Sequence, residues 1–127
     1  MSPSTNIRLI GHSLGAHVIQ STMKNLVKNI KNQGVIEAVY LFGGSISADS
    51  LNPTNGSAMQ KIVAKKIRNY YSPYDDVLRL AEEWNWMVTP IGYKGAYGKT
   101  ISKYTQTMLK PKNHRLVSNA KSLSSFP

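Results

Sequence analysis

The chain is 127 residues long, which suits one domain with a modest core, and 41% of its residues are hydrophobic, as in globular proteins. It has no cysteine, which excludes disulfide bonds, thiolate catalysis and cysteine-bound metals, and it shows neither a signal peptide nor an apolar run of roughly 18 residues. Its net charge of +10 comes from scattered basic residues, so nucleic acid is not the expected partner, and we expect a cytoplasmic protein, free or peripheral to membranes.

The first half of the chain predicts a strand, a helix and a second strand. Residues 6–10 are rich in branched aliphatic side chains and predict a short strand that ends at Gly11. Apolar residues then recur at helical spacing from Leu14 to Ile30, Gly34 follows as a glycine that ends the helix, and residues 35–42 predict a mostly buried strand. This order is typical of two parallel strands joined by a right-handed crossover.

The second half continues the alternation after a break at Gly43-Gly44-Ser45 and a loop to residue 56. Ser57 is expected to cap the next helix. The predicted elements are a helix over 58–64, a strand over 66–71, a helix over 76–86, a loop over 87–98, a strand over 100–108 and a helix over 116–126. We therefore predict one α/β domain over residues 1–127, with helices on both faces of a parallel sheet and ligands at the carboxyl ends of the strands.

The segment Gly11-His-Ser-Leu-Gly15 fits the pattern Gly-x-Ser-x-Gly. In this pattern a serine occupies a sharp turn between a strand and a helix, and we expect both flanking glycines to prevent a clash. Because a strand is predicted before the motif and a helix after it, we interpret Ser13 as a nucleophile rather than a serine in a plain turn. The backbone N–H of Leu14 is then the expected donor to an oxyanion.

A serine nucleophile needs a base, and His114 is the best placed of the three histidines. His12 directly precedes the serine, so its side chain is expected to point away and to pack beneath the turn. His17 follows Ser13 by one helical turn and is expected on the helix surface or in packing. His114 comes after the last predicted strand, in a loop from which a base reaches over the strand ends.

The base needs a carboxylate, and two adjacent aspartates follow the third predicted strand. Neighbouring side chains point in different directions, so only one of them faces the histidine. Asp76 is placed to cap the next helix, which leaves Asp75 as the expected acid and Asp76 as the fallback. The order Ser13, Asp75, His114 is the chain order of an α/β-hydrolase triad.

At these residues the chain resembles the α/β-hydrolase superfamily. The segment from Gly11 to Val18 looks like the elbow of neutral lipases of the pancreatic type, although those enzymes are disulfide-bonded and this chain has no cysteine. A longer likeness, from Ile7 to about Leu123, is to an uncharacterised hydrolase-like family that includes transmembrane and coiled-coil domain-containing proteins. The segment Tyr71-Ser-Pro-Tyr-Asp-Asp-Val-Leu78 matches that family's Tyr-Ser-x-x-Asp-x-x-Leu, which favours Asp75, and Asn113-His114 falls at its late histidine.

The resemblance also implies a partial hydrolase fold that starts at the elbow strand. In that superfamily other strands precede the elbow strand, and a loop among them supplies the second oxyanion donor. Here the strand comes directly after the N-terminal residues, so we expect it to be an exposed sheet edge beside uncovered apolar surface. We expect a separately encoded half, a dimer partner or an upstream extension to complete the sheet.

Two functions fit these observations. The first is a serine hydrolase, esterase-like or lipase-like, that cleaves carboxylic esters through Ser13, His114 and Asp75. The alternative is a catalytically inactive α/β-hydrolase-like interaction module attracted to anionic surfaces. No metal or cofactor motif is present in the sequence, so we expect a small-molecule ester or lipid substrate and no cofactor.

Overall fold

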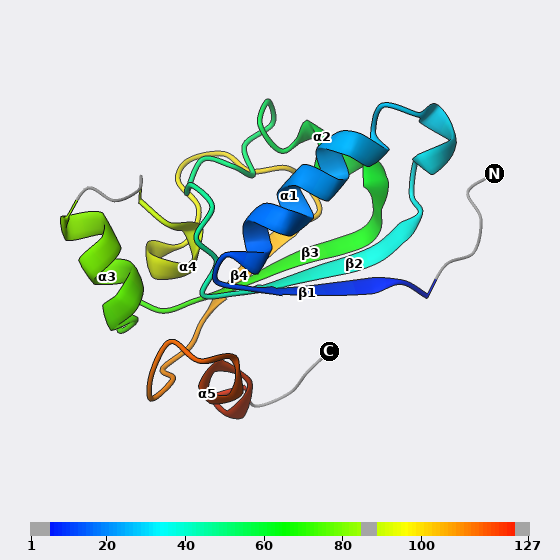
Figure 1. Ribbon diagram of the computed structural model, residues 1–127. Coiled ribbons are helices and arrows are strands. Elements are labelled where there is room, and N and C mark those ends of the chain that lie inside the picture. The colour runs from blue at the N-terminus through cyan, green and yellow to red at the C-terminus, as the bar shows by residue number, and fades with distance from the viewer. Residues whose placement is uncertain (1–5, 85–88, 124–127) are drawn as a thin grey trace.

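The computed structural model describes residues 6–84 and 89–123, which form an α/β fold with a parallel sheet (Figure 1). The strand order is β1-β2-β3-β4. The strands are β1 (Arg8–His12), β2 (Ile36–Phe42), β3 (Val63–Tyr71) and β4 (Tyr104–Met108). The helices are α1 (Gly15–Leu26), the 3₁₀ helix η1 (Ile30–Asn32), α2 (Ser57–Ile62), α3 (Asp76–Glu83), α4 (Ile91–Lys94) and α5 (Leu116–Lys121).

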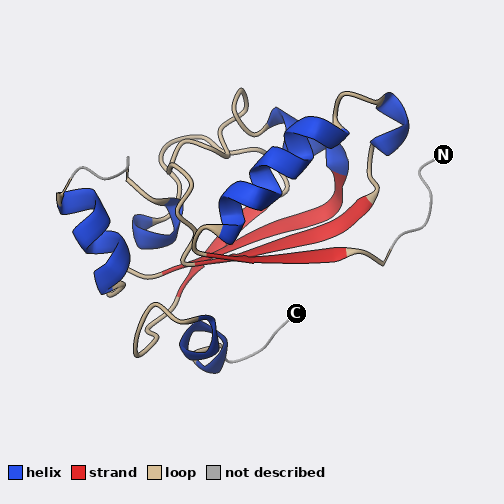
Figure 2. Ribbon diagram, in the orientation of Figure 1, coloured by secondary structure: helices blue, strands red, loops and turns tan. Residues whose placement is uncertain are grey.

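Helices lie on both faces of the sheet, as predicted. Figure 2 shows α1 and α2 over one face and α5 on the opposite side, whereas α3 and α4 lie near the carboxyl ends of the strands. Every residue of β2 is buried, and its side chains alternate between the two faces. Val39 and Leu41 pack in the core under α1 and α2, whereas Tyr40 and Phe42 pack with Tyr70 in a smaller core on the other face.

Helix α1 is shorter than predicted, and only part of the apolar stripe predicted for it is buried. It ends at Leu26, and η1 starts a new turn because the side chain of Asn29 accepts a hydrogen bond from the backbone N–H of Lys31. Its buried residues, at helical spacing, are Ala16, Ile19 and Met23. Leu14 and Val18, which the apolar pattern placed on the buried side, are each 67% exposed.

Several other boundaries differ by a few residues from the predicted ones. β1 continues through Gly11 to His12, which pairs with Phe42 of β2. Gly56, and not Ser57, is the N-cap of α2. β3 starts earlier than predicted, at residue 63, and β4 starts later, at residue 104; α3 ends at residue 83 and α5 at residue 121, and the predicted helix ends at 86 and 126 lie outside the described residues.

The prediction of a loop over 87–98 is wrong where α4 forms; residues 87 and 88 are not described. Ile91 is fully buried in the core, and its N–H donates to the carbonyl of Ile46 at 2.7 Å. Gly92 packs so closely on the end of β2 that a Cβ there would lie 2.2 Å from the Gly44 nitrogen. This glycine therefore allows a close backbone approach within a helix, although the composition of residues 87–98 was typical of a loop.

β1 is an edge strand, as predicted for the strand that precedes the serine. Ile7, just before this strand, is 52% exposed, and Ile10, within it, is 54% exposed. Leu14 and Val18, one helical turn apart at the start of α1, are exposed too. An edge strand with apolar side chains around it offers unpaired backbone groups to a further strand.

Candidate active site

Ser13 occupies a strained turn between β1 and α1. Its φ of 55° is the only positive φ of a residue other than glycine among residues 6–84 and 89–123. The turn is held from β2, because the Ser13 N–H donates to the carbonyl of Phe42 at 3.1 Å, and the N–H and hydroxyl of Ser45 both donate to the carbonyl of Ser13 at 3.1 Å. A nucleophile elbow has this strained strand-to-helix geometry.

Only the first of the two flanking glycines is required by close packing. A Cβ on Gly11 would lie 2.7 Å from the Ile19 Cδ1 and 3.3 Å from the Ala16 nitrogen, so a side chain there would displace the buried end of Ile19 and crowd the backbone at the start of the helix. A Cβ on Gly15 would meet nothing within 4 Å. The expectation that both glycines prevent a clash is therefore correct for Gly11 and wrong for Gly15.

The fold brings Ser13, His114 and Asp75 together, although 101 residues separate the serine from the histidine. Each follows a different parallel strand, and the carboxyl ends of parallel strands share one side of the sheet. The His114 Nε2 lies 2.8 Å from the Ser13 Oγ, and its Nδ1 lies 2.5 Å from the Asp75 Oδ2. The Asp75 side chain is 1% exposed and that of His114 14%, so little water competes for these contacts.

Asp75 contacts the histidine and caps α3 at the same time. Its Oδ1 accepts a hydrogen bond from the Leu78 N–H at 3.0 Å, while Oδ2 faces His114. Asp76, which was expected to be the cap, is 81% exposed and pairs with Arg79 at 3.5 Å. The two oxygens of one carboxylate thus perform both tasks, and the expected division between two aspartates is wrong.

Two side chains that the sequence did not single out as functional hold the backbone of His114. The ring of His12 lies 4.8 Å from the ring of His114, and its Nε2 donates to the His114 carbonyl. Asn119, which is 2% exposed, donates from Nδ2 to the carbonyls of Arg115 at 2.9 Å and His114 at 3.3 Å. His12 was expected to pack beneath the turn, and its contact with His114 was not predicted. The only signal of this contact in the sequence is the position of His12 directly before the serine.

Gly43, at the end of β2, makes room for the histidine and aspartate. Its φ is 53°, and a Cβ there would lie 3.1 Å from the His114 Cε1, 3.2 Å from Nδ1 and 3.3 Å from the Asp75 Oδ2. The sequence identified this glycine only as a residue that ends a strand. Its further role depends on two side chains that come much later in the chain.

Leu14 and His17 lie where they were predicted, at the start of α1. No described residue accepts a hydrogen bond from the Leu14 N–H, so this donor is available beside Ser13. His17 is exposed and lines a groove of about 640 Å³ between α1 and the loop after β2. In the described part of the chain, no group of three or more acidic or histidine side chains is placed to hold a metal ion.

Comparison with known proteins places the chain in a family. Residues 3–108 match the family described as a protein of unknown function (DUF726). The chain belongs to this family. Ser13 and Asp75 lie within the matched residues and His114 lies just beyond them.

A curated relative carries the family name that the sequence resemblance suggested. The transmembrane and coiled-coil domain-containing protein STS1 of Oryza sativa subsp. japonica is 36% identical over 72 residues, which are 57% of this chain and 10% of that protein. The chain thus spans about a tenth of this relative's length. Over the residues that the structure describes, no helix has the length and apolar character needed to cross a membrane. No solved structure matches the chain.

Proposed function

We propose that the chain is a serine hydrolase of the α/β-hydrolase type that cleaves carboxylic esters. The observation that supports this most strongly is the contact of the His114 Nε2 with the hydroxyl of a serine at positive φ, with Asp75 on the other ring nitrogen. A base within hydrogen-bond reach of the nucleophile, itself oriented by a buried carboxylate, is the arrangement that acyl transfer needs.

In this mechanism the Ser13 Oγ attacks the ester carbonyl while the His114 Nε2 takes its proton. The buried Asp75 carboxylate accepts the Nδ1–H of His114 and stabilises the imidazolium that forms. His114 then gives its proton to the leaving alcohol, which leaves an acyl group on Ser13. A water molecule, activated by the same histidine, attacks this acyl group and releases the acid and the free serine.

The Leu14 N–H is one donor to the oxyanion that forms in these steps. Loss of a single such donor costs about a hundredfold or more in rate, so a full oxyanion hole needs a second one. We propose that a strand beside the open edge of β1, from a partner chain or a second copy, supplies it. The exposed apolar residues around this edge support the proposal.

Turnover of a small chromogenic ester tests the proposal. The wild-type chain and a Ser21→Ala control, altered at an exposed serine of α1, are expected to release the alcohol with a burst that reflects the acyl-enzyme. Ser13→Ala is expected to show neither burst nor turnover. Equal activity in Ser13→Ala and Ser21→Ala would contradict the proposal. Complete inactivity of the folded wild type would favour an interaction module, which the charge of +10 also fits.

A further inference from the structure

Positive charge is concentrated in the last third of the chain. All six acidic residues occur at or before Glu83, whereas seven basic residues follow it: Lys94, Lys99, Lys103, Lys110, Lys112, Arg115 and Lys121. The segment that carries His114 and α5 therefore has no acidic residue of its own. Such a segment attracts phosphate-rich or anionic partners, and its sequence alone does not say where.

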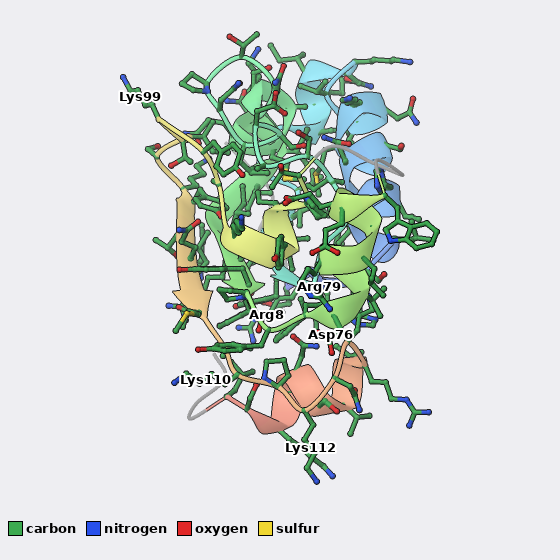
Figure 3. All side chains as sticks on the ribbon, turned by 90° about the vertical axis from the view of Figure 1, so that its left-hand side faces the viewer. Arg8, Asp76, Arg79, Lys99, Lys110 and Lys112 are labelled. Carbon is green, nitrogen blue, oxygen red and sulfur yellow. The ribbon has the colours of Figure 1, made fainter. Side chains whose placement is uncertain are left out.

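The structure gathers three of these lysines around one hollow. Lys110 and Lys112, before His114, and Lys121, at the end of α5, line a cleft of about 310 Å³ together with Ser118 and Ser122. We call this the lysine cleft. Figure 3 shows Lys110 and Lys112 around α5, with the side chain of Lys112 pointing away from the sheet.

The charge of the lysine cleft is not neutralised within the described part of the chain. All three lysines are exposed, and none of them lies within salt-bridge distance of a described carboxylate. The Lys110 Nζ lies 5.9 Å from the centre of the Tyr74 ring, a contact that leaves the positive charge in place. Three like charges around one hollow repel one another, and an anion between them would relieve that repulsion.

Apolar side chains are exposed beside the same cleft. Leu116 and Val117, the first two residues of α5, are 41% and 61% exposed, and Tyr74, next to Lys110, is 59% exposed. Basic residues together with exposed aliphatic and aromatic side chains are typical of a surface that lies on an anionic bilayer. A soluble phosphate compound would use the lysines but would gain nothing from the exposed leucine and valine.

We propose that the lysine cleft binds the phosphate headgroups of an anionic lipid surface, with Leu116 and Val117 in contact with the acyl-chain boundary. This binding goes beyond the proposed function, because no part of it uses the Ser13 hydroxyl. His114 lies in the same loop as Lys110 and Lys112. If the membrane contact and the hydrolase activity both hold, the membrane contact brings the ester bonds of lipids near the serine.

Vesicle binding of three forms of the whole chain tests the proposal. One variant replaces the lysine cleft (Lys110→Gln, Lys112→Gln, Lys121→Gln). A matched control replaces three exposed lysines in α1, in η1 and between them (Lys24→Gln, Lys28→Gln, Lys31→Gln). Both variants lose the same charge. Because a lysine at a membrane surface contributes about 1 kcal/mol, the cleft variant is expected to bind phosphatidic acid vesicles roughly 100-fold more weakly than wild type. The control is expected to change severalfold at most.

Equal weakening of both variants, or no binding of the wild type to these vesicles over pure phosphatidylcholine ones, would overturn the proposal. Inorganic phosphate could instead raise the melting temperature of the wild type but not that of the cleft variant, while both forms bind vesicles equally. This result would make the cleft a site for soluble anions. Circular dichroism checks that each variant folds, and the single reversals Lys112→Glu and Lys31→Glu repeat the comparison if a triple variant does not. Ser13→Ala is expected to bind vesicles as the wild type does, so failure of the proposed hydrolase activity leaves this result intact.

Discussion

Substitution of Gly43 separates the alignment of the proposed triad from the stability of the fold. Gly43 has a φ of 53°, and alanine at such a φ costs roughly 1 to 2 kcal/mol of stability. The added methyl carbon would lie 3.1 to 3.3 Å from atoms of His114 and Asp75, tighter than ordinary van der Waals contact. The pair must therefore shift by a few tenths of an ångström, and we expect this shift to disturb the contact between His114 and Ser13.

Gly98→Ala is the matched control for this effect. Gly98 has a φ of 67°, so alanine there has a similar backbone cost, but its Cβ would meet nothing within 4 Å. Since misplacement by about 1 Å can cost a hundredfold in rate, we expect Gly43→Ala to lower kcat/KM for a small ester by about tenfold or more. Gly98→Ala is expected to leave kcat/KM unchanged.

The assay combines ester hydrolysis with urea unfolding of both variants. Both are expected to lose stability, and only Gly43→Ala is expected to lose activity. If Gly43→Ala keeps the kcat/KM of the wild type, the reasoning that this glycine makes room for an aligned His114 is refuted. An equal loss of activity in both variants would refute it as well, because the common backbone strain would then be the cause.

Two further predictions concern the support of His114 and the sheet. His12→Leu removes the donor to the His114 carbonyl and should lower kcat/KM by about tenfold without changing KM. His12→Gln keeps an N–H donor and should restore much of the lost kcat/KM. Equal kcat/KM values for the two variants would count against a positioning role for His12. Burial raises the pKa of Tyr104 to about 12. Between pH 10 and 12 the unfolded tyrosine ionises and the folded one does not, so the wild type is expected to lose up to about 2 to 3 kcal/mol of stability as the pH rises through this range. The Tyr104 hydroxyl accepts a hydrogen bond from the Asn69 side chain at 2.8 Å, so Tyr104→Phe should be less stable than wild type by about 1 kcal/mol below pH 10. Above pH 10 this difference in unfolding free energy should narrow, because only the wild type has the buried Tyr104. Unfolding curves in which the difference stays constant above pH 10 would contradict a raised pKa of Tyr104 as the cause.

The sequence was sufficient to predict the main elements and the three residues of the candidate triad. A strand, a tight turn and a helix around Ser13 are local features, and the ends of parallel strands collect on one side, which brings Asp75 and His114 near it. Local composition was misleading in the segment that forms α4, because Gly92 is there for a contact with the end of β2. Periodicity likewise placed Leu14 on the buried side of α1, although it lies at the exposed start of the helix.

The residues that support the site were not predictable from local patterns. Gly43, His12 and Asn119 act through contacts with His114, and two of them are separated from it by many tens of residues along the chain. Each of these contacts depends on how β1, β2 and α5 meet in space. The double role of Asp75 has a similar origin, because it follows from the direction in which α3 leaves the end of β3.

Covalent labelling of the serine tests the central claim most directly. A fluorophosphonate loses fluoride when an activated serine oxygen attacks its phosphorus, and mass spectrometry then identifies the modified residue. We predict one adduct, on Ser13, that is absent in Ser13→Ala and forms at least about a thousandfold more slowly in His114→Ala, because the base is lost. A folded wild-type chain that forms no adduct, or forms it at the same rate without His114, would contradict the account.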